Sequence, residues 1–434
     1  MTAPDFPANS LVARCGPSLI GLAAFGVMAL IAWLGAPYQS ILQWWGIQPG
    51  DRLFIDSEAV LLAMDCWRQG ADVFVPNACM GGGYYSYSPT LLKAALLPIG
   101  PEDTVVVGMA VMAAFLASLC LLPPAQLWGE LGLRCAAVLS TAAAFAVERA
   151  NVDVIVFVIT ILGLWHLSGR GAARALGYGA FLVAAAVKFY PVTLLGLVVR
   201  ERFWIAVATA AAALAALGLV LLGSGDKVRE AVQLAPAWPP LYDVFGARNL
   251  PLLVSQMVGH TESAALRAPL PATGWLTMAV LVAAAAWIAS RSAAADARRW
   301  PLVPAREAIF MIGGMVIVLG CFIAAQNASY RAIFLLAALP GLVTLVRGGQ
   351  SRALLIGVML LLWGDLFRHL ERMIAFLAIG GSAGIILDIV FWTLRELLWW
   401  AVMARFAALI AVFVWFTDTG TRFRTWARDL MVAR

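Results

Sequence analysis

Four short clusters of charged and polar side chains interrupt long apolar runs in this sequence, at residues 54–58, 148–153, 188–191 and 326–331. A charged group among apolar residues is costly, so each cluster is a candidate functional site. Together the clusters offer carboxylates, which can accept a proton, and cations, which can hold an anion.

The carboxylates lie in the first two clusters. Asp56 and Glu58 precede an amphipathic stretch over 59–68, which could lie in a membrane interface, and a carboxylate is favourable at the start of a helix. A helix N-cap in a solvated loop is the other interpretation of Asp56. The second cluster is a tight turn between two apolar runs, for which a hairpin cap is the alternative; its polar residues are Glu148, Arg149, Asn151 and Asp153.

The cations lie in the last two clusters. Lys188 ends a run with no other charge, and Pro191 breaks the helix, so Lys188 is placed to meet an anion. Arg331 opens the next apolar run, and its planar guanidinium suits phosphate. Both cations could instead be snorkelling side chains that reach the membrane interface.

The composition identifies the elements that must position these clusters. The chain has 434 residues, 62% of them hydrophobic and 12% charged, and its mean hydropathy is +0.88. Soluble domains are about 45–50% apolar and about 25% charged. This composition excludes an ordinary soluble enzyme, a disordered protein and a nucleic-acid binder, and the net charge of +6 fits basic cytoplasmic loops. It predicts an all-α, polytopic integral membrane protein forming one transmembrane domain over 1–434.

Spanning helices need about 20 apolar residues, and the sequence predicts about 11–13 of them. The runs are 17–36, 104–124, 133–149, 152–168, 174–190, 203–223, 274–290, 307–325, 330–346, 353–370, 373–394 and 397–416. The run 191–199 would be only about 13 Å long as a helix, which predicts half of a broken or re-entrant element. One segment between 353 and 416 is expected to be re-entrant; otherwise the predicted number of membrane spans is off by one.

The loop charges predict the orientation. Residues 38–103 form a long loop with seven acidic and three basic side chains. The opposite loops are rich in arginine: Arg134, Arg170, Arg174, Arg200, Arg202, Arg291, Arg298, Arg299, Arg306, Arg347 and Arg352. The positive-inside rule places the arginine-rich loops in the cytoplasm, so 38–103 and 224–273 are predicted to be periplasmic loops of a bacterial inner-membrane protein.

The cysteines and histidines show no metal-binding spacing, so no metal site and no cofactor are predicted, although a divalent cation stays open. Cys15, Cys120, Cys135 and Cys321 lie in or beside apolar spans and are expected to be packed thiols. Cys66 and Cys79 share the long loop, where a disulfide between them is left open.

The order of the motifs resembles that of the C-type (GT-C fold) glycosyltransferases. An early exterior Asp is followed by a Tyr-x-Pro stretch at 87–89, an Arg-x-Asn-x-Asp turn at 149–153, a Lys-x-Tyr-Pro break at 188–191 and a late Tyr-Arg at 330–331. The resemblance covers most of 10–350 and is to the branch that includes the bacterial polyprenyl-phosphate-mannose mannosyltransferases. The chain departs from the usual pattern at Ala150, where that pattern has Gly.

The resemblance implies a set of roles. Asp56 matches the catalytic base, and Glu58 is a candidate second acid. The donor phosphate would be held by Lys188, Arg331 and Arg149. The remaining residues expected to line the substrate cavity are Glu148, Asn151, Asp153, Tyr87, Tyr190, Tyr330 and Asn327.

The predicted function is therefore transfer of a sugar, such as mannose or another hexose or pentose, from a polyprenyl-phosphate donor to a lipid or glycan acceptor, with inversion. The expected partners are that donor, that acceptor and membrane lipids, and not nucleic acid. Two alternatives stay open: a transporter or flippase of lipid-linked sugars, and an O-antigen polymerase or ligase. Clustering of the charges at one side, without internal repeats, favours the enzyme over a carrier.

Overall fold

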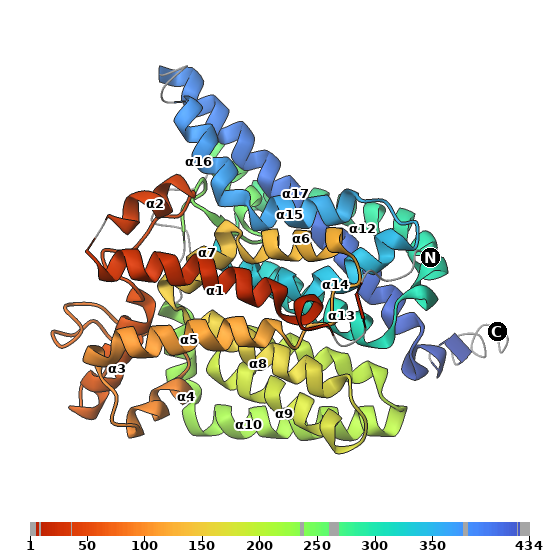
Figure 1. The fold of residues 1–434 in the computed structure, drawn as a ribbon, viewed down its shortest axis with the longest axis horizontal. Helices are drawn as coiled ribbons and strands as arrows, with labels where there is room; N and C mark the ends of the chain where they lie inside the picture. The colour runs from red at the N-terminus through yellow and green to blue at the C-terminus, as the bar shows by residue number, and fades with distance from the viewer. Residues whose placement is uncertain are drawn as a thin grey trace.

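A computed structural model of the chain describes residues 6–7, 10–35, 37–234, 238–259, 269–375, 381–422 and 424–425. The second predicted loop, 224–273, therefore lies partly outside the described residues. The described chain is almost entirely helical, and most of the long helices run side by side across the molecule (Figure 1).

The first half of the chain forms a bundle with one group of short helices at its end. The helices of the bundle are α1 (Leu11–Trp33), α5 (Thr104–Leu119), α6 (Trp128–Val138), α7 (Thr141–Arg149), α8 (Val152–Leu167), α9 (Ala172–Val187) and α10 (Phe203–Leu234). The short group comes from the long acidic loop and comprises α2 (Tyr38–Trp44), α3 (Ile55–Arg68), α4 (Pro89–Leu92), η1 (Lys93–Leu96) and η2 (Pro101–Asp103).

The second half packs against the first. Its helices are α11 (Asn249–Met257), α12 (Ala272–Arg299), η5 (Trp300–Leu302), α13 (Ala305–Ala324), η6 (Ser329–Phe334), α14 (Leu335–Arg347), α15 (Ala353–Leu362), α16 (Gly364–Ile374) and α17 (Gly381–Trp415). Two short antiparallel strands, β1 (Val244–Phe245) and β2 (Asn327–Ala328), pair Val244 with Ala328 and Phe245 with Asn327.

The fold is an all-α, multi-pass membrane fold. Among the described residues, seven helices are long and apolar enough to cross a membrane, or up to nine if each bent pair is one span. The bent pairs are α6 with α7, at 45°, and α15 with α16, at 68°. The short run after Pro191 forms a 3₁₀ helix, η3 (Tyr190–Arg200), after Lys188 leaves the α conformation.

The structure differs from the predicted spans in three places: bends interrupt the spans expected over 133–149 and 353–370, and the last two spans merge. The two spans expected over 373–394 and 397–416 are largely one continuous helix, α17. The charges of Arg395 and Glu396 lower the local hydropathy, but both side chains are paired, with Asp243 and Asn249 respectively, so the helix continues through them. At 1.5 Å per residue its 35 residues are about 52 Å long, so α17 must be tilted or extend beyond a hydrocarbon core of about 30 Å.

Glycines let the central helices approach closely. A Cβ at Gly313 of α13 would lie 2.3 Å from Leu164 of α8, and one at Gly314 would lie 2.9 Å from the Phe334 carbonyl oxygen. Small residues are the usual means of close helix packing in membranes. This contact fixes α13 and η6 against α8, and the site described below lies at the ends of these elements.

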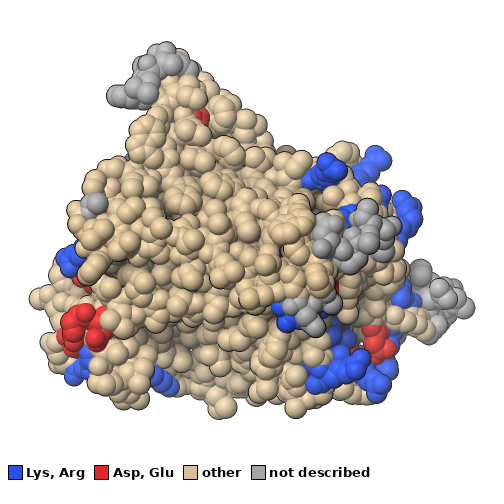
Figure 2. Space-filling model, in the orientation of Figure 1, with Lys and Arg blue, Asp and Glu red and all other residues tan. Residues whose placement is uncertain are grey.

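The charged side chains separate along the bundle. Figure 2 shows that most Lys and Arg on this face lie at the right-hand end, while an acidic patch lies at the left-hand end, where α3 is, with a broad uncharged surface between them. An uncharged band flanked by two charged ends is the surface expected of a membrane-embedded bundle. We call the end that carries α2, α3 and α4 the site end.

The cysteine predictions had different outcomes. Cys66 of α3 and Cys79 form a disulfide with 5.9 Å between their Cα atoms. The expectation of packed thiols is wrong for Cys15 and Cys120, which the structure pairs as a second disulfide because the ends of α1 and α5 meet there. Cys135 and Cys321 are free thiols.

Candidate functional site

The start of α3 is fastened to the turn between α7 and α8. The Phe54 amide donates to the Glu148 carbonyl at 2.9 Å, and the Ser57 hydroxyl donates to the Ala150 carbonyl at 2.7 Å. Phe54 adopts a left-handed conformation (φ 63°), and its ring packs where only the missing side chain of Gly108 leaves room. These contacts direct Asp56, in the first turn of α3, toward the turn at 148–153.

Asn151 connects the two segments. Its side-chain oxygen Oδ1 accepts from the Asp153 backbone amide at 2.8 Å and so caps α8. Its amide nitrogen donates to Asp56 Oδ2 at 2.6 Å and to the Tyr330 hydroxyl at 3.0 Å, and it lies 3.4 Å from the Tyr87 hydroxyl. Asn151 is fully buried, so this one side chain holds Asp56 in position relative to three separate elements.

Asp153 pairs with both predicted cations. Its Oδ1 lies 2.6 Å from Lys188 Nζ and accepts from the Tyr190 hydroxyl at 2.7 Å, and its Oδ2 accepts from Arg331 Nε at 2.9 Å. Lys188 is only 8% exposed, and Arg331 also points into the bundle. The structure therefore does not show the snorkelling alternative for either cation.

Aromatic rings and an amide complete the surroundings of the two cations. Lys188 Nζ lies 5.0 Å from the centre of the Tyr87 ring, and the Arg331 guanidinium lies 5.3 Å from that of Tyr190. Arg331 also donates to Asn327, whose own amide donates to the Cys321 carbonyl at 2.7 Å. The end of α13 thus holds the guanidinium in place.

Arg149 lies on the more open side of Asp56. Its NH1 is 3.7 Å from Asp56 Oδ1 and its Nε is 3.3 Å from Glu148 Oε2, while Glu148 accepts from the Gly50 amide at 3.0 Å. The side chains of Asp56 and Arg149 are each 23% exposed. Asp56 and Arg149 are therefore partly accessible, while Asp153 is not.

Partial burial changes the proton affinity of Asp56. Burial raises the pKa of this carboxyl above its ordinary value, and the Asn151 hydrogen bond and the nearby Arg149 and Lys188 only partly oppose that shift. Burial also raises the pKa of Tyr87, aided by the carboxylates of Asp56 and Asp153, so Tyr87 is a neutral hydrogen-bonding group.

Eleven of the twelve predicted site residues come together, and Glu58 does not. Its carboxylate accepts from Arg52 at 2.8 Å in an exposed pair on the outer side of α3. The structure gives Glu58 no contact with the cluster around Asp153. Within the described ranges, no group of three or more His, Cys, Asp or Glu side chains could hold a metal ion.

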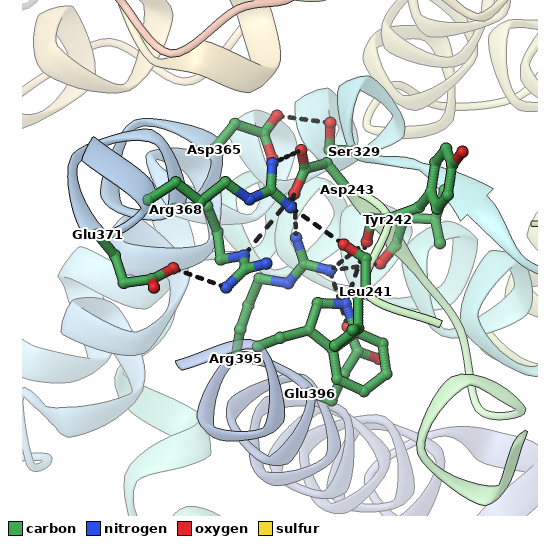
Figure 3. Close-up of polar contacts among 12 residues, drawn as sticks. Leu241, Tyr242, Asp243, Ser329, Asp365, Arg368, Glu371, Arg395 and Glu396 are labelled. Carbon is green, nitrogen blue, oxygen red and sulfur yellow. Dashed lines mark hydrogen bonds and ion pairs between the residues drawn. The ribbon is translucent and has the colours of Figure 1, made fainter. Parts of the chain in front are cut away.

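A second charged cluster was missed by the sequence analysis. It joins the segment before β1 to α16 and α17 (Figure 3). It consists of Asp243, Asp365, Arg368, Glu371, Arg372, Asp388, Arg395 and Glu396. Four of these residues are buried, Asp365, Arg368, Glu371 and Glu396, and the Arg395 side chain is 9% exposed. Ionisable residues inside the apolar runs over 353–416 were the available signal, because the same reasoning identified the other four clusters.

Comparison with known proteins adds little to this geometry. No protein-family model matches the chain, and no curated protein matches it. Among solved structures, the crystal structure of ArnT from Cupriavidus metallidurans in the apo state aligns with a TM-score of 0.35 and 12% identity, over 90% of this chain and 76% of that chain. A likeness of that size carries no argument about activity, so the functional conclusion depends on the contacts described above.

Proposed function

We propose that the chain is a GT-C-like membrane glycosyltransferase that moves a sugar from a polyprenyl-phosphate donor to a hydroxyl acceptor, with Asp56 as general base. The observation that carries this proposal is the convergence of Asp56 with Arg149, Lys188 and Arg331 at one end of the bundle. Four segments that are far apart in the sequence contribute to it. By the positive-inside rule, the site end faces the periplasm of a bacterial inner membrane.

The charges suit a phosphate leaving group. Lys188 and Arg331 share one carboxylate, Asp153, so the three groups carry one net positive charge in a buried setting. A phosphate that gains charge as its bond to the sugar breaks would be stabilised there, because fixed cations away from water need no reorganisation. Arg149 adds a third cation on the open side.

The reaction balances with these groups. The acceptor oxygen attacks the anomeric carbon, the bond from that carbon to the phosphate oxygen breaks, and polyprenyl phosphate leaves. The acceptor proton passes to Asp56, whose raised pKa makes it a better proton acceptor than an exposed aspartate. Attack opposite the leaving group inverts the anomeric carbon.

The proposal is tested with the full chain reconstituted in vesicles with a polyprenyl-phosphate mannose labelled in the sugar, and a membrane lipid and glycan extract as acceptor source. We expect polyprenyl phosphate to form and label to enter a new product. Movement of intact donor between the leaflets, without cleavage of the sugar–phosphate bond, would contradict the proposal and support a flippase.

Transfer should depend on pH through Asp56. The base acts only when deprotonated, so activity is lost as the pH falls through its pKa, and burial moves that pKa upward. We expect the acid limb of kcat/KM to lie at higher pH than an exposed aspartate would give, which is about pH 4. A profile that stays flat down to that pH would argue against Asp56 as the base.

Loss of a phosphate-binding cation should weaken donor use. In Lys188→Ala, Asp153 keeps its pair with Arg331, so the fold is retained, while a charged contact worth about tenfold or more in affinity is lost. We expect kcat/KM for the donor to fall by about that factor or more, because Lys188 would contact the phosphate both before and during cleavage. Lys227→Ala is the matched control, because Lys227 pairs with the exposed Asp72 outside the site. Equal donor dependence in both variants would exclude Lys188 from donor binding.

A further inference from the structure

A cavity of about 430 Å³ lies directly beside the candidate site. It is bounded by the loop after α2, by α7, by the segment 238–244, by β2 and by α16. Small-molecule sites have volumes of about 300–1,000 Å³. Arg149, which contacts Asp56, also lines this cavity, and so does Ala328, two residues before Tyr330. A molecule bound there would therefore lie next to the proposed base.

One wall of the cavity is held in a fixed conformation by arginines. The Asp243 carboxylate lies 3.0 Å from Arg372 NH1 and 3.4 Å from Arg395 NH1, and these same arginines donate to the carbonyls of Leu241 and Tyr242 at 3.0 and 3.1 Å (Figure 3). Leu241 has a positive φ of 75°, a costly conformation that these bonds maintain. A wall that is already ordered loses little freedom when a ligand binds.

Asp365 supplies unused hydrogen-bonding capacity in this cavity. It is 8% exposed, and its Oδ2 accepts from the Ser329 hydroxyl at 2.5 Å. Among the described residues it forms no ion pair within 4.0 Å, although it lines the cavity. A carboxylate can accept several hydrogen bonds, and Asp365 accepts only the one from Ser329 among those described. A ligand with hydroxyl donors would satisfy it.

The rest of the lining favours a neutral ring with hydroxyl groups. Trp238 and Tyr242 line the cavity with ring centres 5.7 Å apart, and aromatic rings of this kind pack against the apolar faces of sugars. The two lining arginines are already engaged, Arg372 by Asp243 and Arg149 by Asp56 and Glu148. An anionic ligand would also meet Asp365, so a neutral saccharide fits the charges best.

We infer that this cavity binds the saccharide portion of the acceptor, with Asp365 accepting hydrogen bonds from its hydroxyls and Trp238 packing against its ring. This inference rests on the proposed function and extends it by naming a sugar hydroxyl as the acceptor class. It places acceptor recognition on α16 and the segment 238–244. Arg149 lies between this cavity and the donor cations Lys188 and Arg331, which do not line it.

Binding is measured without any reaction, so that the inference can be judged independently of transfer. The full chain in lipid nanodiscs is titrated with methyl mannopyranoside, methyl glucopyranoside and methyl galactopyranoside by saturation-transfer NMR. The ring ether 2-methoxytetrahydropyran, which lacks the hydroxyls, is the control ligand. We expect saturable binding of at least one glycoside and none of the ring ether.

Variants test whether the glycosides bind in this cavity. Asp365→Asn keeps the shape and is expected to weaken glycoside binding about tenfold. Trp238→Leu is expected to weaken glycoside binding about fivefold. The hydrogen bonds between the backbone of residue 238 and the Gln326 side chain remain in this variant. It tests the inference even if Asp365→Asn fails to fold. Asp51→Asn, which changes an exposed carboxylate outside the cavity, should leave binding unchanged.

Two results would overturn the inference. One is the absence of saturable glycoside binding up to the solubility limit, and the other is binding that both cavity variants leave unchanged. If sugar transfer occurs and these results are found, the cavity assignment fails while the proposed function stands. If the glycosides bind in the cavity but no donor is cleaved, the proposed function fails instead.

Discussion

Replacement of Asp56 by Asn is expected to lower sugar transfer by about 10²- to 10⁴-fold, the range that a positioned general base contributes. An asparagine keeps the size of the side chain and can still bond to Asn151 after an amide flip, so the fold should be retained. It cannot take the acceptor proton. The measurement is kcat with a polyprenyl-phosphate sugar in reconstituted vesicles, together with donor binding, which should change far less than kcat.

The matched control for this variant is Asp65→Asn. Asp65 lies on the same helix, α3, and pairs with Arg68 on the exposed side. We expect its activity to equal that of the wild type. Glu58→Gln should behave like Asp65→Asn, because Glu58 contacts Arg52 rather than the cluster. Retained transfer in Asp56→Asn would refute the base assignment, and a loss in Glu58→Gln would move it to Glu58.

Replacement of Asp153 by Ala is expected to cost about 3–5 kcal/mol of folding free energy, the usual result of breaking a buried ion pair. Asp153 has no exposed surface, and its removal leaves Lys188 and Arg331 facing each other without a counter-charge. The midpoint of unfolding in a denaturant titration of the purified protein measures the effect.

A matched exposed pair separates this effect from simple charge loss. Asp72 pairs with Lys227 at 3.0 Å, with both side chains at least 40% exposed, so Asp72→Ala should cost about 1 kcal/mol or less. The double variant Asp153→Ala/Lys188→Met should recover part of the stability, because it removes one unpaired cation. Equal midpoints for Asp153→Ala and Asp72→Ala would show that Asp153 does not hold the cations.

The sequence predicted the all-α membrane fold and most of the site because both depend on strong local signals. Charges are rare in the apolar runs, so Asp56, Lys188 and Arg331 were conspicuous, and the structure brings them together around Asn151 and Asp153. The role of Asp153 as a shared counter-ion was not predicted, since it depends on distances between elements that are far apart in the chain.

The predictions that were wrong also depend on contacts between distant segments. Arg395 and Glu396 suggested a break between two spans, but their partners Asp243 and Asn249 come from a distant segment that hydropathy does not connect with them. The Cys15–Cys120 pair likewise depends on how α1 meets α5. Glu58 was grouped with Asp56 by proximity in sequence, yet two residues along a helix point in clearly different directions.

Ala150 shows how a departure from a pattern can be understood from the backbone. It adopts a left-handed conformation, with φ 43° and ψ 46°, at the end of α7. Glycine adopts this conformation without strain, whereas for another residue the conformation costs about 1–2 kcal/mol. The chain tolerates alanine because the Ala150 carbonyl and its neighbours are bound by α3 and α8, so the turn keeps its shape.

The turn at 148–153 also limits how the gene can change in length. Successive residues there bond to α3, to Asp56, and to Lys188 and Arg331, so each position has a different partner in a different direction. One inserted or deleted codon would shift all of these partners at once, and no single substitution could restore them. Divergence in this region must therefore proceed by replacement of residues, whereas the exposed glycines at 81–83 could absorb additions without disturbing the bundle.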